Sequence, residues 1–216
     1  MKFLAVDTAN EYMSVVAYND GKVAGAFLPD CTMRHSTQIM AQVEKALEEA
    51  KLTLAECDFF AAVVGAGSFT GIRIGVSAVK GFCLACGKPS LPITSFEIAA
   101  YNTLGQDDKT LCLVDALHDA YYVCGFDRDK NVILPPAYLT EEEVLALVQE
   151  GYALRAIRSK DEWGIAIVEK VDVVPCNPVD GLLAAVLAKA QAGAFAPLDA
   201  LYVRKSSAEI NLEKTV

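Results

Sequence analysis

The sequence predicts an α/β protein with two lobes that share one order of strands and helices. Its 216 residues are enough for two lobes of about 100 residues each. Hydrophobic residues make up 53% of the chain and charged residues 22%, a composition that supports a substantial core. Val6-Asp7-Thr8 and Val114-Asp115-Ala116 each end the first expected strand of one half. We therefore predict a duplicated architecture with lobes at residues 1–106 and 107–216.

The first half is expected to alternate apolar strands with amphipathic helices. Short apolar runs separated by turns favour an antiparallel meander of three strands at the start. Ile39, Val43 and Leu47 recur every four residues, which is typical of a helix with one buried face. Thr53 and Glu56 form a capping box. The expected elements are strands 2–7, 12–18 and 23–28, helix 33–50, strand 59–65, helix 70–86, strand 90–94 and helix 95–104.

The second half repeats this order with shorter elements. Thr140 and Glu143 form a second capping box, and Pro178 occupies the favoured first turn of the last helix. One helix of the first half is missing or shortened between residues 158 and 170. The expected elements are strands 110–115, 120–126 and 131–134, helix 140–150, strands 152–157 and 171–174, and helix 178–192.

Charge and composition exclude several classes of protein. The net charge of −9 excludes a basic nucleic-acid-binding domain acting alone, because phosphate contacts need a positive surface. Asp7 interrupts the N-terminal apolar run too early for a signal peptide, and the longest uncharged stretch, residues 59–72, is shorter than a membrane span. We expect a cytoplasmic protein without a membrane partner. The seven cysteines are expected to be mostly buried thiols, and no metal site is expected.

Two lobes that each carry an aspartate hairpin resemble the fold shared by actin, sugar kinases and Hsp70 (the ASKHA, ribonuclease H-like fold). In that superfamily the two hairpins, here at Asp7 and Asp115, face a cleft that holds ATP and its metal. The alternative is a mixed α/β protein of another topology with two unrelated aspartates at turns.

The segment from Gly65 to Gly75 is the most distinctive part of the sequence. It follows an apolar strand and opens a helix, whose free N–H groups and dipole attract anions. It does not match a P-loop, because no Gly-Lys-Ser/Thr follows. A phosphate cradle and a structural turn capped by Ser68 or Thr70 both remain open. The candidate anion or nucleotide contacts are Asp7, Thr8, Gly67, Ser68 and Thr70.

Gly71 and Gly75 lie one turn apart on the same face of the expected helix. A glycine inside a helix costs about 1 kcal/mol relative to alanine, so two on one face indicate a close packing contact. The contact is either with a helix of a partner or with the chain's own sheet.

The sequence from Gly65 to Gly75, followed by Ser77-Ala78-Val79-Lys80-Gly81, resembles the signature of the TsaB (YeaZ) family. Further matches are Ala5-Val6-Asp7-Thr8, His35-Ser36, residues 52–58, Thr94-Ser95-Phe96-Glu97, Leu113-Val114-Asp115-Ala116 and Leu201-Tyr202-Val203-Arg204. Ala66 departs from the family's usual proline, and Leu117 from a common arginine. The somewhat short second lobe and its change at Leu117 leave the function of that lobe in doubt.

This resemblance implies a non-catalytic subunit that binds a TsaD-like paralogue. The complex transfers threonylcarbamoyl to adenosine 37 of tRNAs that read codons beginning with A. Ser95 and Ala99 stand where the paralogue has two metal-binding histidines, which indicates a pseudo-enzyme. The implied partner-binding residues are His35, Ile39, Gly71, Ile72, Arg73, Gly75, Val76 and Val79.

The resemblance also implies a TsaE-like ATPase as a further partner, a homodimer when the chain is alone, and contact with tRNA only through the complex. No cofactor is expected in this chain, and ATP or ADP is expected only at the interface of the complex. One alternative is an ATP-dependent kinase or ATPase of the actin superfamily that uses Asp7 and Asp115 as ligands of metal-bound water. Another is a protein that binds tRNA directly, which the net charge disfavours.

Overall fold

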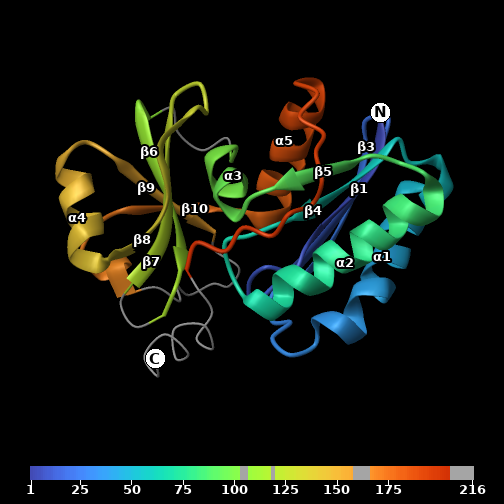
Figure 1. The fold of residues 1–216 in the computed structure, drawn as a ribbon, viewed down its shortest axis with the longest axis horizontal. Helices are drawn as coiled ribbons and strands as arrows, with labels where there is room; N and C mark the ends of the chain where they lie inside the picture. The colour runs from blue at the N-terminus through green and yellow to red at the C-terminus, as the bar shows by residue number, and fades with distance from the viewer. Residues whose placement is uncertain (103–106, 118–119, 158–165, 205–216) are drawn as a thin grey trace, which may run out of the picture.

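The computed structural model describes residues 1–102, 107–117, 120–157 and 166–204. These residues form two five-stranded mixed sheets (Figure 1). The first sheet has the order β3-β2-β1-β4-β5, with strands Lys22–Leu28, Met13–Asn19, Lys2–Asp7, Phe59–Val63 and Ser90–Ile93. The second has the order β8-β7-β6-β9-β10, with strands Val132–Thr140, Ala120–Asp127, Lys109–Asp115, Ala153–Ile157 and Val173–Cys176. The two sheets share one strand order, which confirms the predicted duplication.

Strand directions are also repeated between the two sheets. In the first sheet β1 and β2 are antiparallel, as are β2 and β3, while β4 and β5 run parallel to β1. In the second sheet β6, β7 and β8 form the antiparallel set, and β9 and β10 continue in parallel. The predicted meanders are therefore confirmed, and Asp7 and Asp115 end the equivalent strands β1 and β6.

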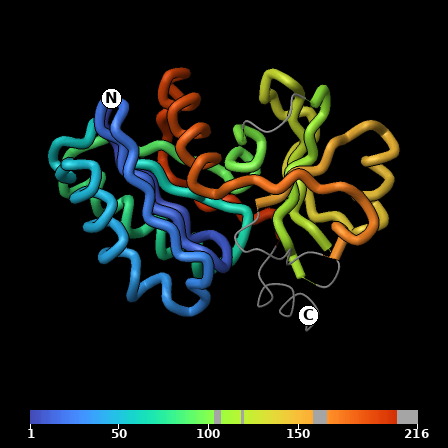
Figure 2. Tube along the Cα trace, turned by 180° about the vertical axis from the view of Figure 1, so that it is seen from behind, coloured from blue at the N-terminus to red at the C-terminus, as the bar shows by residue number. Residues whose placement is uncertain are grey.

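Helices cover both faces of the first sheet. Helices α1 (His35–Ala50) and α2 (Phe69–Cys86) lie on one face, and α5 (Pro178–Gln191) lies on the other (Figure 2). Leu182, Ala185 and Val186 of α5 belong to the same buried core as strands β1, β2 and β4. Helix α5 therefore packs on the first sheet, although it lies in the second half of the sequence.

The short helix α3 (Ser95–Ala100) connects the two halves, since it packs against both α5 and β6. Gly181 makes the contact with α5 close, because a methyl group there would lie 2.2 Å from the carbonyl oxygen of Ile98. Lys189 of α5 and Glu97 of α3 form an ion pair at 2.7 Å in the same contact. The structure therefore fixes α3 between the C-terminal helix and the second sheet.

The second lobe differs from the prediction at β8, which continues to Thr140 through Pro135 and Pro136. The prolines suggested an end at residue 134, but β8 lies at the edge of its sheet, where a missing N–H is tolerated. Helix α4 (Glu141–Gln149) follows and begins with the predicted capping box of Thr140 and Glu143. Most of the expected helix deletion between 158 and 170 lies outside the described residues, and a single 3₁₀ turn covers Ala166–Glu169.

Other local predictions are confirmed by the structure. The capping box at Thr53 starts the 3₁₀ turn Leu54–Glu56, and Pro178 is in the first turn of α5. All seven cysteines are free thiols. Five are buried, while Cys83 and Cys86 on α2 are partly exposed.

Candidate functional site

The candidate site lies where the hairpin between β1 and β2 meets the N-terminal end of α2. The glycines of the Gly65–Gly75 segment allow this approach. A methyl group on Gly67 would lie 2.2 Å from the carbonyl oxygen of Ala9, and one on Gly71 would lie 2.1 Å from that of Thr8. At Gly75 the same group would lie 2.5 Å from the Thr8 hydroxyl. The three glycines therefore accommodate the chain's own hairpin.

Hydrogen bonds join the hairpin to the glycine segment. The Ser68 backbone N–H donates to the carbonyl oxygen of Ala9 at 2.6 Å, and the Thr8 hydroxyl donates to the carbonyl oxygen of Gly71 at 2.7 Å. The Ser68 hydroxyl caps α2 by accepting from the Gly71 N–H at 3.2 Å. Of the two readings of this segment, the structural turn capped by Ser68 fits the geometry. The phosphate cradle does not fit, because the hairpin occupies the space that the glycines leave.

Asp7 is fully buried beneath this hairpin. Its Oδ1 accepts a hydrogen bond from the Ala9 N–H at 2.9 Å. Burial raises the pKa of Asp7 from 3.8 to about 6, while the Ala9 amide, the Tyr12 hydroxyl and the His35 ring oppose this rise. The kinase alternative requires Asp7 to bind a water molecule held by a metal ion. The buried carboxyl does not suit this role, because it has no surface exposed to solvent.

Asp115, the equivalent residue of the second lobe, repeats only part of this arrangement. Its Oδ1 accepts from the Leu117 N–H at 2.8 Å, so the same local turn follows both strands. Its side chain is exposed, whereas that of Asp7 is buried. The two aspartates that sequence reasoning grouped together are thus in different environments.

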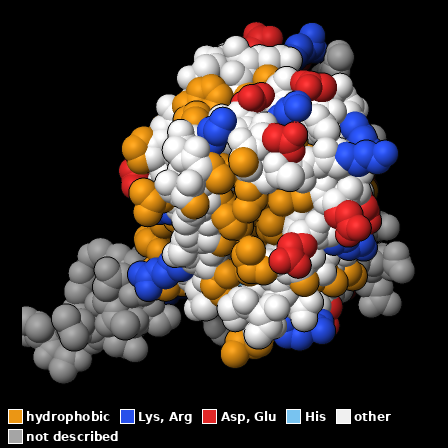
Figure 3. All heavy atoms as spheres, turned by 90° about the vertical axis from the view of Figure 1, so that its right-hand side faces the viewer, with side chains coloured by type: hydrophobic (Ala, Val, Ile, Leu, Met, Phe, Trp, Pro, Cys, Tyr) orange, Lys and Arg blue, Asp and Glu red, His pale blue; other side chains and the backbone are white. Residues whose placement is uncertain are grey.

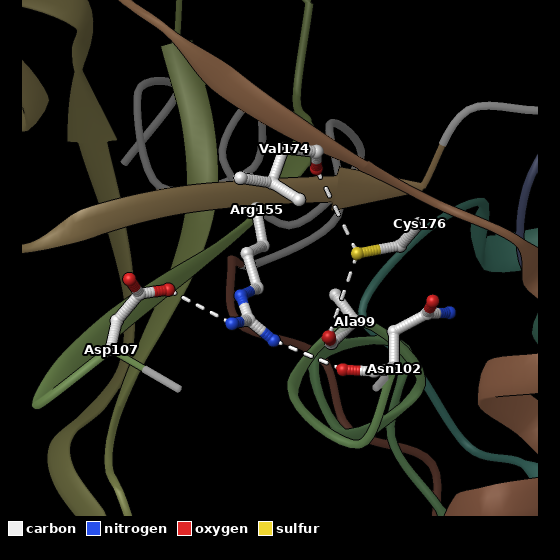
Figure 4. Close-up of polar contacts among 6 residues, drawn as sticks. All are labelled: Ala99, Asn102, Asp107, Arg155, Val174 and Cys176. Carbon is white, nitrogen blue, oxygen red and sulfur yellow. Dashed lines mark hydrogen bonds and ion pairs between the residues drawn. The ribbon is translucent and has the colours of Figure 1, made fainter. Parts of the chain in front are cut away.

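Ser95 and Ala99, the positions compared with two metal histidines, are buried where α3 meets its neighbours. The Ser95 hydroxyl donates to the carbonyl oxygen of Ala66 at 2.6 Å. The carbonyl oxygen of Ala99 accepts from the Cys176 thiol at 3.6 Å (Figure 4). Within the part of the chain that the structure describes, no cluster of three His, Cys, Asp or Glu residues is arranged to hold a metal ion.

Arg155 holds the end of α3 against the second sheet. It extends from β9, is completely buried, and donates to the carbonyl oxygen of Asn102 at 3.0 Å (Figure 4). It also pairs with the Asp107 carboxylate at 2.9 Å. Sequence reasoning did not single out this arginine, and its only sequence signal is a charged residue inside an otherwise apolar strand.

The predicted partner-binding residues are placed mostly inside the first lobe. The structure buries seven of the eight, which are His35, Ile39, Gly71, Ile72, Gly75, Val76 and Val79. His35 contacts the Tyr12 carbonyl oxygen through Nε2 at 3.0 Å, as a structural histidine does. Gly71 and Gly75 pack on Thr8 of the same chain, which fits the reading in which the glycine face packs within the chain, and partner binding at these residues stays a prediction. Arg73 alone of the eight is exposed.

Another face of the first lobe carries exposed apolar side chains among polar ones. We call it the α1/α2 outer face and define it by the exposed Met33 just before α1, Met40 on α1 and Leu84 on α2, with the half-buried Ile74 and Ala78. Leu84 is 87% exposed and Met40 is 45% exposed. Figure 3 shows hydrophobic side chains gathered in a band on the first-lobe end of the molecule, with charged side chains around them. The predicted partner-binding residues and this face lie on the same two helices, and which of them meets a partner stays a prediction.

Length and composition also make α2 a candidate membrane span, although only 28% of it is buried. One such helix is weak evidence for a span, because helices of soluble proteins pass the same test. Its glycine face is already packed on the hairpin, and its exposed positions include Arg73 and Lys80, so the helix does not present a fully lipid-facing surface.

The two similar lobes and the closed hairpin define a two-lobed protein of the actin-like fold, and comparisons with known proteins agree. The model of the family "TsaD: tRNA N6-adenosine threonylcarbamoyltransferase" matches residues 14–195. The TsaB protein of Escherichia coli is 32% identical over 165 residues, which cover 76% of this chain and 69% of that protein. The chain belongs to the TsaB (YeaZ) family.

Two further relatives are consistent with this assignment. TsaB of Buchnera aphidicola is 32% identical over 111 residues, which cover 51% of this chain and 52% of that protein. The structure of YeaZ from Pseudomonas aeruginosa superposes with a TM-score of 0.77 at 22% identity, and the match covers 93% of this chain and 99% of that one. At that identity the structural match shows the fold alone.

Proposed function

We propose that this chain is a non-catalytic subunit of the complex that makes N6-threonylcarbamoyladenosine at position 37 of tRNAs reading codons beginning with A. Its task is to bind and support a TsaD-like catalytic paralogue. The E. coli and Buchnera relatives are named tRNA threonylcarbamoyladenosine biosynthesis proteins. The observation that carries the proposal is the α1/α2 outer face, because large exposed apolar side chains such as Met40 and Leu84 on two neighbouring helices are typical of protein-binding surfaces.

The closed hairpin supports a non-catalytic role. Thr8 and Ala9 fill the glycine segment, and the Ser95 hydroxyl is hydrogen-bonded to a backbone carbonyl. These contacts leave the first lobe without an open phosphate cradle, so we propose that any ATP or ADP used by the complex binds at its interface and not within this chain. The paralogue holds the metal and performs the transfer.

Further parts of the proposal concern partners and location. A TsaE-like ATPase joins the complex, and stable binding of tRNA requires the assembled complex. Without the paralogue, the α1/α2 outer face forms a homodimer, since burying exposed apolar surface stabilises either assembly. We propose a cytoplasmic location and no membrane partner.

Charged substitutions on the α1/α2 outer face test the proposal. Met40→Glu together with Leu84→Glu is expected to weaken binding to the TsaD-like paralogue at least about tenfold, because each change places a carboxylate in an apolar contact. Isothermal titration calorimetry of the two purified proteins measures this change. The thermal midpoint of the isolated chain is expected to stay nearly constant, since both side chains are exposed.

Val132→Glu is the matched control, because Val132 is also an exposed apolar residue, at 54%, but lies on the edge strand β8 of the second lobe. This variant is expected to bind the paralogue normally. Unchanged binding by the Met40 and Leu84 double variant, with loss of binding in the Val132 variant, would place the interface on the second lobe instead.

A further inference from the structure

A second exposed surface combines arginines with aromatic rings and is distinct from the α1/α2 outer face. At the start of α2 the guanidinium carbon of Arg73 lies 3.8 Å from the centre of the Phe69 ring. The Phe69 and Tyr202 rings are 4.4 Å apart, and Arg73 Nε donates to the Tyr202 hydroxyl at 3.0 Å. All three side chains are exposed.

The same surface continues onto the second lobe through the segment after α5. Arg204 donates to the Tyr138 hydroxyl at 3.4 Å, and its guanidinium carbon lies 4.9 Å from the centre of that ring. Tyr122 stands 5.9 Å from Tyr138, ring centre to ring centre. We call the set of Phe69, Arg73, Tyr202, Arg204, Tyr138 and Tyr122 the arginine–aromatic surface.

The chain segment that presents Tyr202 and Arg204 is held in place. Leu201 and Val203 pack into the core, while Tyr202 and Arg204 alternate with them and are exposed. The Leu201 N–H donates to the carbonyl oxygen of Val64 at 2.7 Å, and Gly65 permits this approach, since a methyl group there would lie 2.4 Å from the Leu201 carbonyl oxygen. The surface is thus preorganised, which lowers the entropic cost of binding a ligand.

The charges on this surface are not neutralised within the described residues. Arg128 and Arg155 form ion pairs with aspartates, but Arg73 and Arg204 form no ion pair with any residue that the structure describes. Two neighbouring guanidinium groups without an acidic partner among the described residues give this surface local positive charge on a chain whose net charge is −9. A guanidinium stacked on a ring keeps its in-plane N–H groups available for an anion.

Exposed rings beside arginines match single-stranded RNA, whose bases stack on aromatic side chains while its phosphates pair with arginine. The surface is also distant from the exposed Leu84 near the other end of α2. Phe69 and Leu84 are 15 residues apart on α2, which corresponds to about 22 Å along the helix. Ile74 of the α1/α2 outer face directly follows Arg73, so the two surfaces meet near the start of α2, and a protein partner leaves room for an RNA strand when it is seated toward Leu84.

We propose that the arginine–aromatic surface binds unpaired nucleotides of RNA, with bases stacked on Phe69, Tyr202 and Tyr138 and phosphates paired with Arg73 and Arg204. This inference rests on the proposed function for the identity of the RNA as tRNA. Two arginines supply modest affinity, so the contact guides tRNA within the assembled complex and adds to the binding by the paralogue.

The first test uses the purified full chain and an oligouridylate at low salt, with ultraviolet crosslinking and mass spectrometric mapping. Crosslinks are expected in the peptides that carry Phe69, Tyr138 and Tyr202. Arg73→Gln with Arg204→Gln is expected to lower their yield about tenfold, because two phosphate contacts are lost. The matched control is Lys22→Gln with Lys45→Gln, which removes the same charge at exposed positions of β3 and α1. Crosslinks elsewhere, or an equal loss in the control, would overturn the proposal.

The second test measures tRNA affinity of the complex with the TsaD-like paralogue. The arginine double variant is expected to assemble normally but to bind tRNA more weakly, with a reduced dependence on salt. Loss of assembly in this variant would make the surface a protein interface and refute the RNA contact. If the wild-type chain does not bind the paralogue, the proposed function fails, whereas the crosslinking map still decides whether this surface contacts RNA.

Discussion

Gly71→Ala is expected to destabilise the chain by about 3 kcal/mol, the upper part of the range for overpacking a close contact. The added methyl group would lie 2.1 Å from the Thr8 carbonyl oxygen, so the hairpin backbone must move. That movement also breaks the hydrogen bond from the Thr8 hydroxyl to Gly71. Chemical denaturation of the purified chain, analysed as a two-state transition, measures the loss in the free energy of unfolding.

Gly81→Ala provides a matched control on the same helix. A methyl group at Gly81 meets no atom within 4 Å, so alanine is expected to stabilise the helix by about 1 kcal/mol through its higher helix propensity. Equal stability changes for Gly71→Ala and Gly81→Ala would show that the hairpin does not pack on α2 in solution. A large side chain at Gly71 is for the same reason unsuitable as a probe of partner binding.

Asp7→Asn is expected to stabilise the protein near neutral pH and to reduce its pH dependence. The pKa of Asp7 is raised by burial to about 6, so in the folded state the carboxyl binds a proton over a range where the unfolded chain does not. The free energy of unfolding therefore falls as pH rises from about 4 to about 6 and then levels off. A shift of about two pKa units corresponds to at most about 3 kcal/mol at pH 8.

The comparison is made by denaturation of both proteins between pH 4 and pH 8. The gain from Asp7→Asn is expected to grow across this range, and asparagine still accepts the Ala9 N–H. Part of the gain is offset because the second amide hydrogen of asparagine needs an acceptor. Asp115→Asn is the control at the equivalent but exposed position, with an expected change within about 0.5 kcal/mol. A loss of stability with Asp7→Asn at pH 8 would contradict the placement of a buried charge there.

Local patterns in the sequence predicted most elements of this fold. The four-residue recurrence of Ile39, Val43 and Leu47 and the capping boxes at Thr53 and Thr140 depend on residues close together in the chain. The repeated aspartate at Asp7 and Asp115 indicated the duplication, because each ends the first strand of a lobe. Local periodicity is sufficient where an element buries one face against a nearby sheet.

The candidate site depended on contacts between distant residues, which periodicity does not reveal. Two close-packed glycines indicate that another backbone approaches, but not whose backbone it is, and the structure gives Thr8 as the neighbour of Gly71. The contact of Arg73 with Tyr202 spans 129 positions, and α5 returns to the first sheet from the far end of the second lobe. These arrangements are set by packing of the whole chain.

We propose that this chain supports catalysis by a TsaD-like paralogue and does not itself catalyse the reaction. The most direct measurement is threonylcarbamoylation of tRNA in a reconstituted reaction containing the paralogue, the TsaE-like ATPase and the threonylcarbamoyl donor, with and without this chain. Threonylcarbamoylated tRNA is expected only when the chain is present. With the Met40→Glu, Leu84→Glu double variant, its yield is expected to fall in proportion to the loss of binding to the paralogue. Equal product formation without the chain, or magnesium-dependent ATP hydrolysis by the chain alone that Asp7→Asn abolishes, would contradict the account.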